Sequence, residues 1–369
     1  MLKRSSSPYF FNGANTNQML RNLEHLESES GFFQNVDCRE KPVFFDNKRQ
    51  MVICSYVHRL GQLKIWAGAI LGKRSFKRIY NAIGTTRVNA HRIRVNYNLI
   101  AFYPDRNMIC KFRHDSSVES IDRIHNEGRA LKAAQNLDFI KVPKVLLDQS
   151  KTDSVNVPAI WIEHIKGKRP SRDEIKNIAC KYAEVLLLWY EHHGIDYLKP
   201  STLFPNYSQN EKITANKLLS YGWDDVESLR IMEAYDKILQ CKMVMPVSWL
   251  HGDAIVLNCM INERGELVII DWENSRKGFI VEDLLKLAHY GGSDIKQLYN
   301  SWLKNRTSNH SNLLDVDMQF DIEFLMRNIN IKDKERYLIS KMSLKKSYEA
   351  VQELKQLVLS KTQNICKSL

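Results

Sequence analysis

A dense segment past the middle of the chain limits its possible architecture more than any other stretch. Residues 248–273 read SWLHGDAIVLNCMINERGELVIIDWE, and two short apolar runs within them, 258–261 and 267–270, flank a polar turn. Apolar runs on either side of such a turn predict a β-hairpin. A His-Gly-Asp triplet ending at Asp253 precedes the first run, and an Asp-Trp-Glu triplet starting at Asp271 follows the second. Acids at the two open ends of an apolar hairpin come close together, which indicates a site rather than a solvated face.

The residue types of this segment suit metal-assisted phosphoryl transfer. In that chemistry one Asp orients the acceptor hydroxyl or takes its proton, while an amide oxygen and a second carboxylate hold Mg²⁺. Asp253 provides the first group, and Asn258, five residues later, together with Asp271 provides the oxygens. The tripeptide alone is a weak signal. The five-residue step to Asn258, the hairpin and the acidic end make chance a poor explanation.

The segment resembles the catalytic core of the aminoglycoside phosphotransferase and choline kinase-like family, a branch of the protein kinase-like fold. That family carries His-Gly-Asp, four residues, Asn, a hairpin, and then an Ile-Asp-aromatic-Glu element, which 251–258 and 270–273 match. Gly278 and the triplet 282–284 (Glu-Asp-Leu) resemble its continuation.

The resemblance implies a function and roles for three residues. It implies a kinase that uses ATP and Mg²⁺, with Asp253 as the catalytic Asp and with Asn258 and Asp271 as Mg²⁺ ligands. Glu273 is expected to orient Asp271 or to touch substrate. His251 is expected to brace the catalytic turn.

A kinase-like chain also needs a Lys on an upstream strand and a Glu on the next helix, because an ion pair fixes the Lys on the phosphates. Lys111 lies in the β-prone run 108–112, and Glu127 lies sixteen residues later in a helical pattern. Glu119, nearer the start of that helix, is the alternative partner.

The remaining nucleotide contacts are less defined. The stretch 160–167 resembles the family's adenine-binding strand and linker, which suggests backbone contacts at Glu163 and Ile165. The chain contains no Gly-x-Gly-x-x-Gly, so the expected phosphate loop is the turn Gly84-Thr85-Thr86-Arg87. Backbone amides in such a turn can bind phosphate.

The distribution of patterns along the chain predicts an α+β fold with a small sheet lobe and a larger helical lobe. The pattern predicts strands at 92–95, 98–103, 108–112, 143–147 and 159–165, and helices at 116–136, 171–193 and 226–241. We expect an N-terminal extension of unknown structure over 1–75, a nucleotide-binding lobe over 76–166 and a helical lobe over 167–369 that contains the catalytic and metal-binding segment 248–284. The resemblance implies that these are the two lobes of a protein kinase-like fold.

The charge balance favours anionic partners. Lys and Arg number 54 against 42 Asp and Glu, a formal net charge of +12. An excess of this size favours nucleotides, phosphorylated metabolites, nucleic acid or an acidic membrane surface. Residues 332–369 alone hold nine Lys or Arg and four acids. This basic end and the basic residues of 73–78 are either a solvated surface or a membrane-surface contact.

Cysteine spacing and the N-terminal sequence indicate the compartment. The seven cysteines form no Cys-x-x-Cys pair, and the chain begins without the apolar region of a signal peptide. A reducing, cytoplasmic location fits this pattern. The most apolar short run, 63–72, is too short to span a bilayer.

Two classes of function remain open from the sequence. The first is a phosphotransferase that moves the γ-phosphoryl group of ATP to a hydroxyl of a small molecule, sugar or glycan-type acceptor. The basic balance argues against a polycationic aminoglycoside as that acceptor. The second is a non-catalytic kinase-like binding module for an anionic partner, although the sequence has no specific nucleic-acid motif. ATP turnover that depends on Asp253 distinguishes the two classes.

Overall fold

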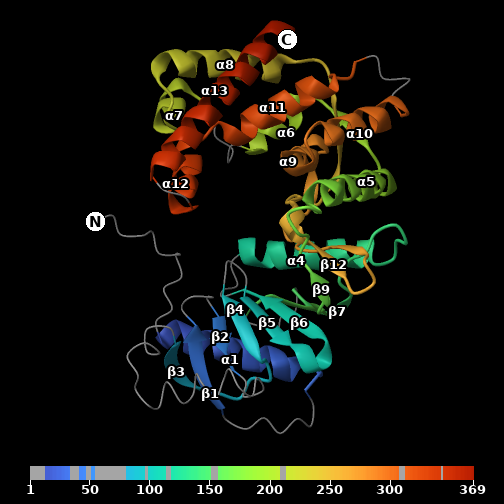
Figure 1. The fold of residues 1–369 in the computed structure, drawn as a ribbon, viewed down its shortest axis with the longest axis vertical. Helices are drawn as coiled ribbons and strands as arrows, with labels where there is room; N and C mark the ends of the chain where they lie inside the picture. The colour runs from blue at the N-terminus through green and yellow to red at the C-terminus, as the bar shows by residue number, and fades with distance from the viewer. Residues whose placement is uncertain are drawn as a thin grey trace. The chain divides into compact units, whose positions relative to one another are not determined.

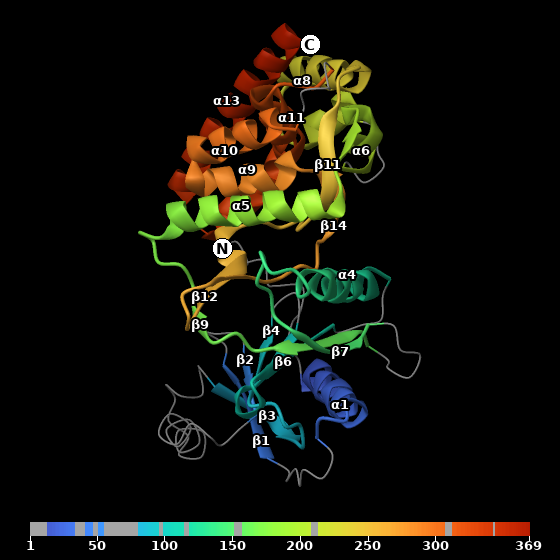
Figure 2. The ribbon, with the colours of Figure 1, turned by 90° about the vertical axis from the view of Figure 1, so that its right-hand side faces the viewer.

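The computed structural model consists of two compact units (Figures 1 and 2). Unit 1 comprises Met1–Arg169 and Met260–Asn274, and unit 2 comprises Pro170–Cys259 and Ser275–Leu369. The structure describes residues 13–33, 41–46, 51–54, 80–95, 99–113, 118–150, 157–207, 213–306, 312–341 and 344–369. The expected α+β class is confirmed, with strands concentrated in the first unit and helices in the second.

Unit 1 is built on an eight-stranded sheet in the order β3-β1-β2-β4-β5-β6-β8-β7. Each neighbouring pair of strands in it is antiparallel. The strands are β1 Lys41–Asp46, β2 Met51–Ile53, β3 Tyr80–Thr86, β4 Arg92–Val95, β5 Leu99–Tyr103, β6 Met108–Phe112, β7 Val145–Gln149 and β8 Ala159–Glu163. The predicted strands from residue 92 to residue 163 are therefore confirmed, with ends shifted by a few residues.

The predicted hairpin turn before Lys111 is also confirmed. The short 3-10 helix η1, Pro104–Arg106, connects β5 to β6, and Asn107 follows it with a φ of 52°. Proline fixes the first turn of η1, and Asn tolerates a left-handed backbone better than most residues do. The turn sets the register Tyr103↔Met108, which continues to Ile100↔Lys111.

Strand alternation gives β6 two different faces. Met108, Cys110 and Phe112 point into the main core of unit 1, together with side chains of helix α1, Gly13–Glu29. Lys111 points to the other face, toward helix α4, Val118–Ala134. Successive side chains of a strand alternate between faces, so α1 and α4 cover opposite sides of the sheet, as Figure 2 shows.

The first part of the chain contributes to this sheet. Strands β1 and β2 come from the stretch 1–75, which the sequence left as an extension of unknown structure, and β2 pairs with β4. Helix α1 is attached through Glu27, whose carboxylate accepts hydrogen bonds from the backbone N–H groups of Asn89 and Ala90 and from the Tyr103 hydroxyl. The sheet therefore begins before residue 76.

The expected phosphate loop at 84–87 is wrong. Gly84, Thr85 and Thr86 lie inside strand β3, where they pair with β1, and Arg87 donates its backbone N–H to Glu24 of α1. Residues that continue a strand paired with β1 do not form the tight turn whose backbone N–H groups converge on phosphate. The two strands that precede β6 in both chain and sheet order are β4 and β5, and their connection at 96–98 lies outside the described residues.

A second, small sheet carries the predicted hairpin of the dense segment. It has the order β13-β12-β9, with β9 Gly167–Lys168, β12 Cys259–Asn262 and β13 Leu267–Ile269. The turn is closed by the Gly265 N–H donating to the Asn262 carbonyl oxygen. Gly167 is required where β9 meets β12, because a Cβ there would lie 2.2 Å from the carbonyl oxygen of Ile261.

Unit 2 is mainly helical around a three-stranded sheet in the order β10-β11-β14. Its elements are α5 Ile175–His193, β10 Asp196–Leu198, α6 Pro200–Tyr207, α7 Ala215–Ser220, α8 Asp225–Gln240, β11 Met245–Leu250, η2 Val256–Asn258, β14 Arg276–Phe279, α9 Val281–Gly291, α10 Ser293–Lys304, α11 Val316–Asn328, α12 Ile331–Lys341 and α13 Leu344–Ser368. The predicted helices 171–193 and 226–241 correspond to α5 and α8. A capping box of Asp224 and Glu227 fixes the start of α8.

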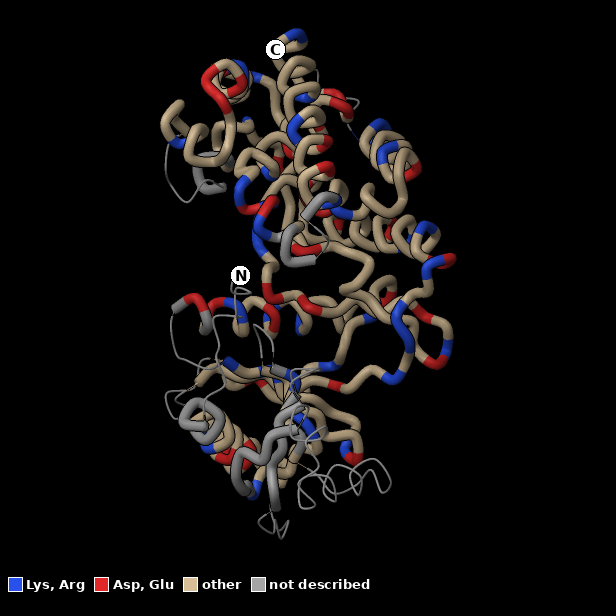
Figure 3. The backbone as a smooth tube through the Cα atoms, turned by 60° about the vertical axis from the view of Figure 1, so that its left-hand side comes forward, with Lys and Arg blue, Asp and Glu red and all other residues tan. Residues whose placement is uncertain are grey.

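The basic C-terminal end packs into unit 2 and is partly neutralised there. Buried Val351, Val358 and Ile365 give α13 an apolar face, and on its other side Lys355 pairs with Glu227 and Lys361 pairs with Asp321. Figure 3 shows acidic and basic positions interspersed through unit 2. Among the described residues, no helix has the length and apolar character needed to cross a membrane. The run 63–72 lies outside the described residues.

Candidate active site

Lys111 and Glu127 form a buried ion pair in unit 1. The Lys111 ammonium, on β6, lies 2.7 and 2.8 Å from the two carboxylate oxygens of Glu127, on α4. Both residues are buried, Lys111 to 5% exposure and Glu127 to 1%. Glu119, the alternative partner, instead pairs with Arg123 one turn further along α4. The structure therefore brings together the Lys and the Glu that the sequence favoured.

Asp271 joins this pair. It follows strand β13, and its Oδ1 lies 2.6 Å from the Lys111 ammonium. Asp271 has a φ of 71°, one of two positive values that the described non-glycine residues adopt. A left-handed Asp is an uncommon conformation that persists where the surrounding structure holds it, often at functional sites. The bend turns the Asp271 carboxylate toward β6 directly after the apolar strand ends.

The pKa values in the cluster reflect three carboxylates close to the Lys111 ammonium. Burial on its own lowers the pKa of Lys111, but the carboxylates of Asp271, Glu127 and Glu273 outweigh it and raise that pKa above its ordinary value. Burial raises the pKa of Glu127 to about 7, and Asp271 and Glu273 add to the rise while Lys111 opposes it. Lys111 and Arg123 bring two positive charges to three carboxylates, so the cluster has room for additional positive charge.

The donor set of this cluster fits a divalent cation. Single carboxylate oxygens of Glu127, Asp271 and Glu273 lie within 4.8 Å of one another. Glu273 is buried, and Arg123 of α4 lies 3.5 Å from its Oε1. Hard cations such as Mg²⁺ prefer oxygen ligands and bind through one or two protein carboxylates. The chemistry of the site therefore matches Mg²⁺ better than a softer metal.

The His-Gly-Asp triplet lies in unit 2, and Asp283 of helix α9 fixes its backbone. The Asp283 carboxylate accepts the N–H groups of His251 at 2.8 Å and Gly252 at 3.1 Å, and the Tyr190 hydroxyl donates to it at 3.1 Å. Gly252 has a φ of 82°, which only glycine adopts without strain. The His251 ring packs edge-on against Tyr182 and accepts the Asp253 N–H at Nδ1. These contacts brace the turn that presents Asp253.

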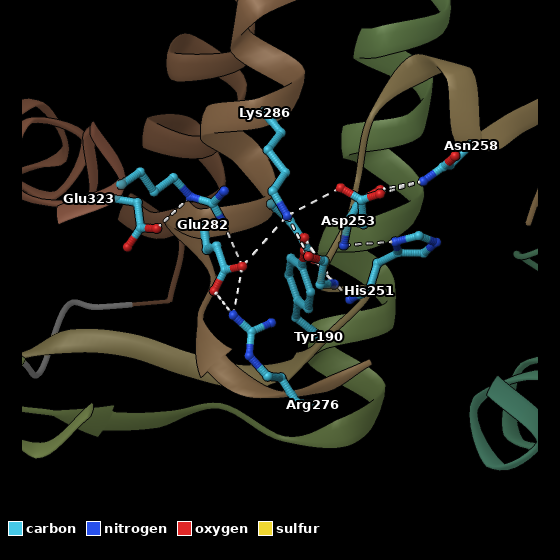
Figure 4. A network of polar contacts seen from close by, with 11 residues as sticks. Tyr190, His251, Asp253, Asn258, Arg276, Glu282, Lys286 and Glu323 are labelled. Carbon is cyan, nitrogen blue, oxygen red and sulfur yellow. Dashed lines mark hydrogen bonds and ion pairs between the residues drawn. The ribbon is translucent and has the colours of Figure 1, made fainter. Parts of the chain in front are cut away.

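Asp253 and Asn258 contact each other across the short helix η2 (Figure 4). The Asn258 amide nitrogen donates to both the backbone oxygen and Oδ2 of Asp253, each at 2.9 Å. Because that nitrogen is used, Oδ1 is the atom of Asn258 that suits a cation. Lys286 of α9 approaches from the other side, with its ammonium 3.6 Å from Oδ1 of Asp253 and a hydrogen bond to the Gly252 carbonyl oxygen.

The buried acid Glu282, next to this group, forms ion pairs with three cationic side chains (Figure 4). Glu282, 1% exposed, accepts two hydrogen bonds from Arg276 and pairs with Arg327 at 2.5 Å and with Lys286 at 3.6 Å. Burial raises the pKa of Glu282, but these cations outweigh it and hold the pKa below its ordinary value. Arg327 also pairs with Glu323 at 2.8 Å.

The predicted site residues thus fall into two internally connected groups. Lys111, Glu127 and Asp271 meet in unit 1, and Asp253 and Asn258 meet in unit 2. Glu163 ends strand β8 in unit 1, where its N–H donates to the Lys144 carbonyl oxygen, and Ile165 follows in the connection to β9.

Sequence reasoning missed Lys286 and assigned no role to Asp283. Both lie on α9, Asp283 within the Glu-Asp-Leu triplet 282–284 and Lys286 two residues after it. The one available signal was the spacing of Glu282 and Lys286, which places them on the same helix face.

The fold and these groups define a kinase-like phosphotransferase. The sequence profile of the phosphotransferase enzyme family matches residues 96–305, more than half of the chain. The chain belongs to this family, and the expected resemblance is confirmed. It is therefore an enzyme, a phosphotransferase.

Solved structures similar to this chain are kinases with low sequence identity. One is a choline kinase from Streptococcus pneumoniae, 13% identical, covering 74% of this chain and 91% of that chain with a TM-score of 0.45. A microcompartment-associated aminopropanol kinase is 12% identical, with 75% and 91% covered and a TM-score of 0.47. A thermostable mutant of an aminoglycoside phosphotransferase is 9% identical, with 73% and 90% covered and a TM-score of 0.44. A search of curated proteins finds no match.

Proposed function

We propose that the protein transfers the γ-phosphoryl group of ATP to a hydroxyl group of a small-molecule or glycan-type acceptor, with Mg²⁺ as cofactor. The observation that carries the proposal is the Lys111 ammonium, held at 2.6–2.8 Å by Glu127 and Asp271 in a buried setting. A strand Lys paired with a helix Glu, next to a metal-binding Asp, is the arrangement that positions nucleotide phosphates in kinases.

Lys111 serves as the phosphate-binding cation. Its two salt bridges restrict the ammonium to one place, so little rotamer entropy is lost when phosphate oxygens arrive. Glu127 holds Lys111 without touching substrate. The backbone at Glu163 and Ile165 binds the adenine.

Asp271 would offer Mg²⁺ a carboxylate oxygen, and the excess of negative charge around Lys111 supports this role. Asn258 would offer its amide oxygen. Bound Mg²⁺ would neutralise part of the phosphate charge. Glu273, in contact with Arg123, orients the acidic end of the hairpin next to Asp271.

Asp253 orients the acceptor hydroxyl and takes its proton as the acceptor oxygen bonds to the γ-phosphorus, while the bond from that phosphorus to the bridging oxygen breaks and ADP leaves. Its backbone is braced by His251, and its Oδ2 is fixed by Asn258, so the carboxylate is directed before substrate arrives. Such preorganisation is the main contribution that a protein makes to phosphoryl transfer.

The acceptor is proposed to be neutral or anionic rather than polycationic. Lys286 lies 3.6 Å from Asp253, so a cationic group of an acceptor would meet a like charge next to the catalytic carboxylate. The net charge of +12 supports the same class.

The test is transfer of label from [γ-³²P]ATP, with and without Mg²⁺, to a panel of sugars, sugar phosphates, amino alcohols, nucleosides and aminoglycosides. Asp253→Asn is the diagnostic variant, and Asp196→Asn, an exposed acid of β10 paired with Lys277, is the matched control.

We expect labelled product that requires Mg²⁺, disappears with Asp253→Asn and persists with Asp196→Asn. Undiminished transfer by Asp253→Asn contradicts the assigned mechanism. A wild-type protein that binds Mg²⁺–ATP but labels no acceptor, water included, favours the non-catalytic binding module.

A further inference from the structure

We propose that Lys286 is a positioning residue for the phosphoryl transfer, acting through Asp253. The inference rests on the proposed function, because it concerns the residue that orients the acceptor. Lys286 lies outside the residues that the sequence motif identified, and all of its relevant contacts lie within unit 2.

Lys286 contacts the catalytic turn at two points. Its ammonium donates to the carbonyl oxygen of Gly252, the residue before Asp253, and lies 3.6 Å from the Asp253 Oδ1 atom (Figure 4). The Lys286 side chain is only 14% exposed. The hydrogen bond places the ammonium firmly against the backbone, so the weaker contact to Asp253 occurs in a defined direction.

Each carboxylate oxygen of Asp253 therefore has its own partner, and the two partners lie on opposite sides of the carboxylate. Asn258 donates to Oδ2, and Lys286 attracts Oδ1. With one of these groups the carboxylate could still turn about its Cβ–Cγ bond, because that torsion is broad in Asp. With both groups present, one orientation of the carboxylate is favoured before the acceptor binds.

The Lys286 ammonium lies between two acids, Asp253 and Glu282, at 3.6 Å from each. Glu282 lies four residues earlier on the same helix face, but Arg276 and Arg327 already neutralise it at 2.5–2.8 Å. Glu282 therefore has closer cationic partners than Lys286, whereas Lys286 is the lysine paired with Asp253. Asp283 is occupied by two backbone N–H groups and Tyr190.

The cost of holding Lys286 there supports a role in function. Burial and the nearby charge of Arg327 lower the pKa of Lys286, whereas Asp283, Glu282 and Asp253 oppose that change. Arg276 and Arg327 already pair with Glu282 at 2.5–2.8 Å, and Arg327 is shared with Glu323. Lys286 adds a hydrogen bond to Gly252 and a contact with Asp253.

Loss of the Lys286 charge should impair the chemical step more than nucleotide binding. An Asp253 carboxylate that can turn is misaligned with the acceptor hydroxyl for part of the time, and small misplacements of a catalytic group cost up to about 100-fold in rate. We expect a fall in kcat of about 10- to 100-fold, with a KM for ATP within about twofold of wild type.

The experiment compares Lys286→Gln, Lys286→Met and Lys286→Arg with wild type. Lys286→Gln keeps a neutral N–H donor on the side chain, and Lys286→Met keeps the aliphatic part without a donor or a charge. Lys296→Gln is the control, because Lys296 is a lysine of unit 2 that pairs with Asp317 at 2.8 Å on helix α11. The probe is steady-state turnover of Mg²⁺–ATP with water as acceptor, repeated with any acceptor that the labelling panel identifies. Thermal melting reports folding.

The expected result is a reduced kcat for both neutral variants, partial recovery with Lys286→Arg, an unchanged KM for ATP and wild-type behaviour of Lys296→Gln. A folded neutral variant with kcat within twofold of wild type overturns the inference, as does an equal loss in Lys296→Gln. If Lys286→Gln does not fold, Lys286→Met decides by the same criteria. An inactive wild-type protein defeats the proposed function and this inference together, whereas an active one insensitive to Lys286 defeats the inference alone.

Discussion

Glu323 should give the protein a pH-dependent stability that one substitution removes. This residue of helix α11 is fully buried, and burial raises the pKa of its carboxyl from an ordinary 4.5 to about 8, with Arg327 opposing the rise. Its Oε1 accepts a hydrogen bond from Arg327 at 2.8 Å, while Oε2 has no hydrogen-bond partner among the described residues. The contact with Arg327 therefore does not fully offset the cost of burying the ionised Glu323 carboxylate in unit 2.

The direction of the effect follows from the two pKa values. A carboxyl with a higher pKa in the folded state stabilises fully below pH 4.5, and this contribution is lost as the pH rises through about 8. The values differ by about 3.5, and each unit corresponds to about 1.4 kcal/mol, so complete ionisation costs at most about 5 kcal/mol. Because Glu282 and Arg327 share charge with Glu323, we expect on the order of 2–4 kcal/mol.

The assay is thermal unfolding of wild type and Glu323→Gln at pH 5.5 and pH 9, followed by tryptophan fluorescence. Gln has nearly the same shape and can accept from Arg327, so the two proteins should have similar melting temperatures at pH 5.5. At pH 9 the variant should melt higher, by roughly 2–4 °C for each kcal/mol in a unit of this size. Glu233→Gln, at an exposed acid of helix α8, is the control and should leave the pH dependence unchanged. Parallel pH dependences of wild type and Glu323→Gln would refute the reasoning.

Two further predictions concern unit 1. Lys111→Met leaves Glu127, Asp271 and Glu273 without their shared ammonium, so we expect turnover of Mg²⁺–ATP to fall at least about 100-fold, and retention of more than a tenth of the activity contradicts the role of Lys111. Glu27→Gln places an amide N–H₂ group where a carboxylate accepts from Asn89, Ala90 and Tyr103, which should destabilise unit 1 by about 2 kcal/mol and speed amide hydrogen exchange at Asn89 and Ala90. Unchanged exchange at those two amides shows that Glu27 does not hold α1 to the sheet.

Features encoded within short stretches of sequence could be predicted. The hairpin β5–β6 follows from apolar runs on either side of Pro104 and Asn107, and α5 follows from its apolar period. The ion pair of Lys111 with Glu127 could also be anticipated, because the family pattern requires a strand Lys and a helix Glu. In these cases the deciding interactions lie within one element or between consecutive elements.

Features that depend on distant pairing could not be predicted. Gly84, Thr85 and Thr86 have turn-like composition, but β1, more than thirty residues earlier, pairs with them and makes them a strand. The turn preference of Gly is a weak predictor beside strand pairing with a distant segment. The attachment of α1 likewise depends on Glu27, whose acceptor role is visible only once residues 89 and 90 are folded beside it.

The distribution of the motif between the two units explains which site residues a sequence can identify. Unit 2 is interrupted by 260–274, so a single short segment supplies Asp253 and Asn258 to one unit and Asp271 to the other. Asp253, Asn258 and Asp271 can therefore be recognised together in a sequence, because they lie at fixed spacings within one short segment of the chain. Lys286 is joined to Asp253 only by folding, through the start of helix α9 and the Asp283 contacts with the turn. A residue that orients a catalytic group, such as Lys286, is thus harder to find in a sequence than the catalytic group itself, because its position next to that group depends on folding.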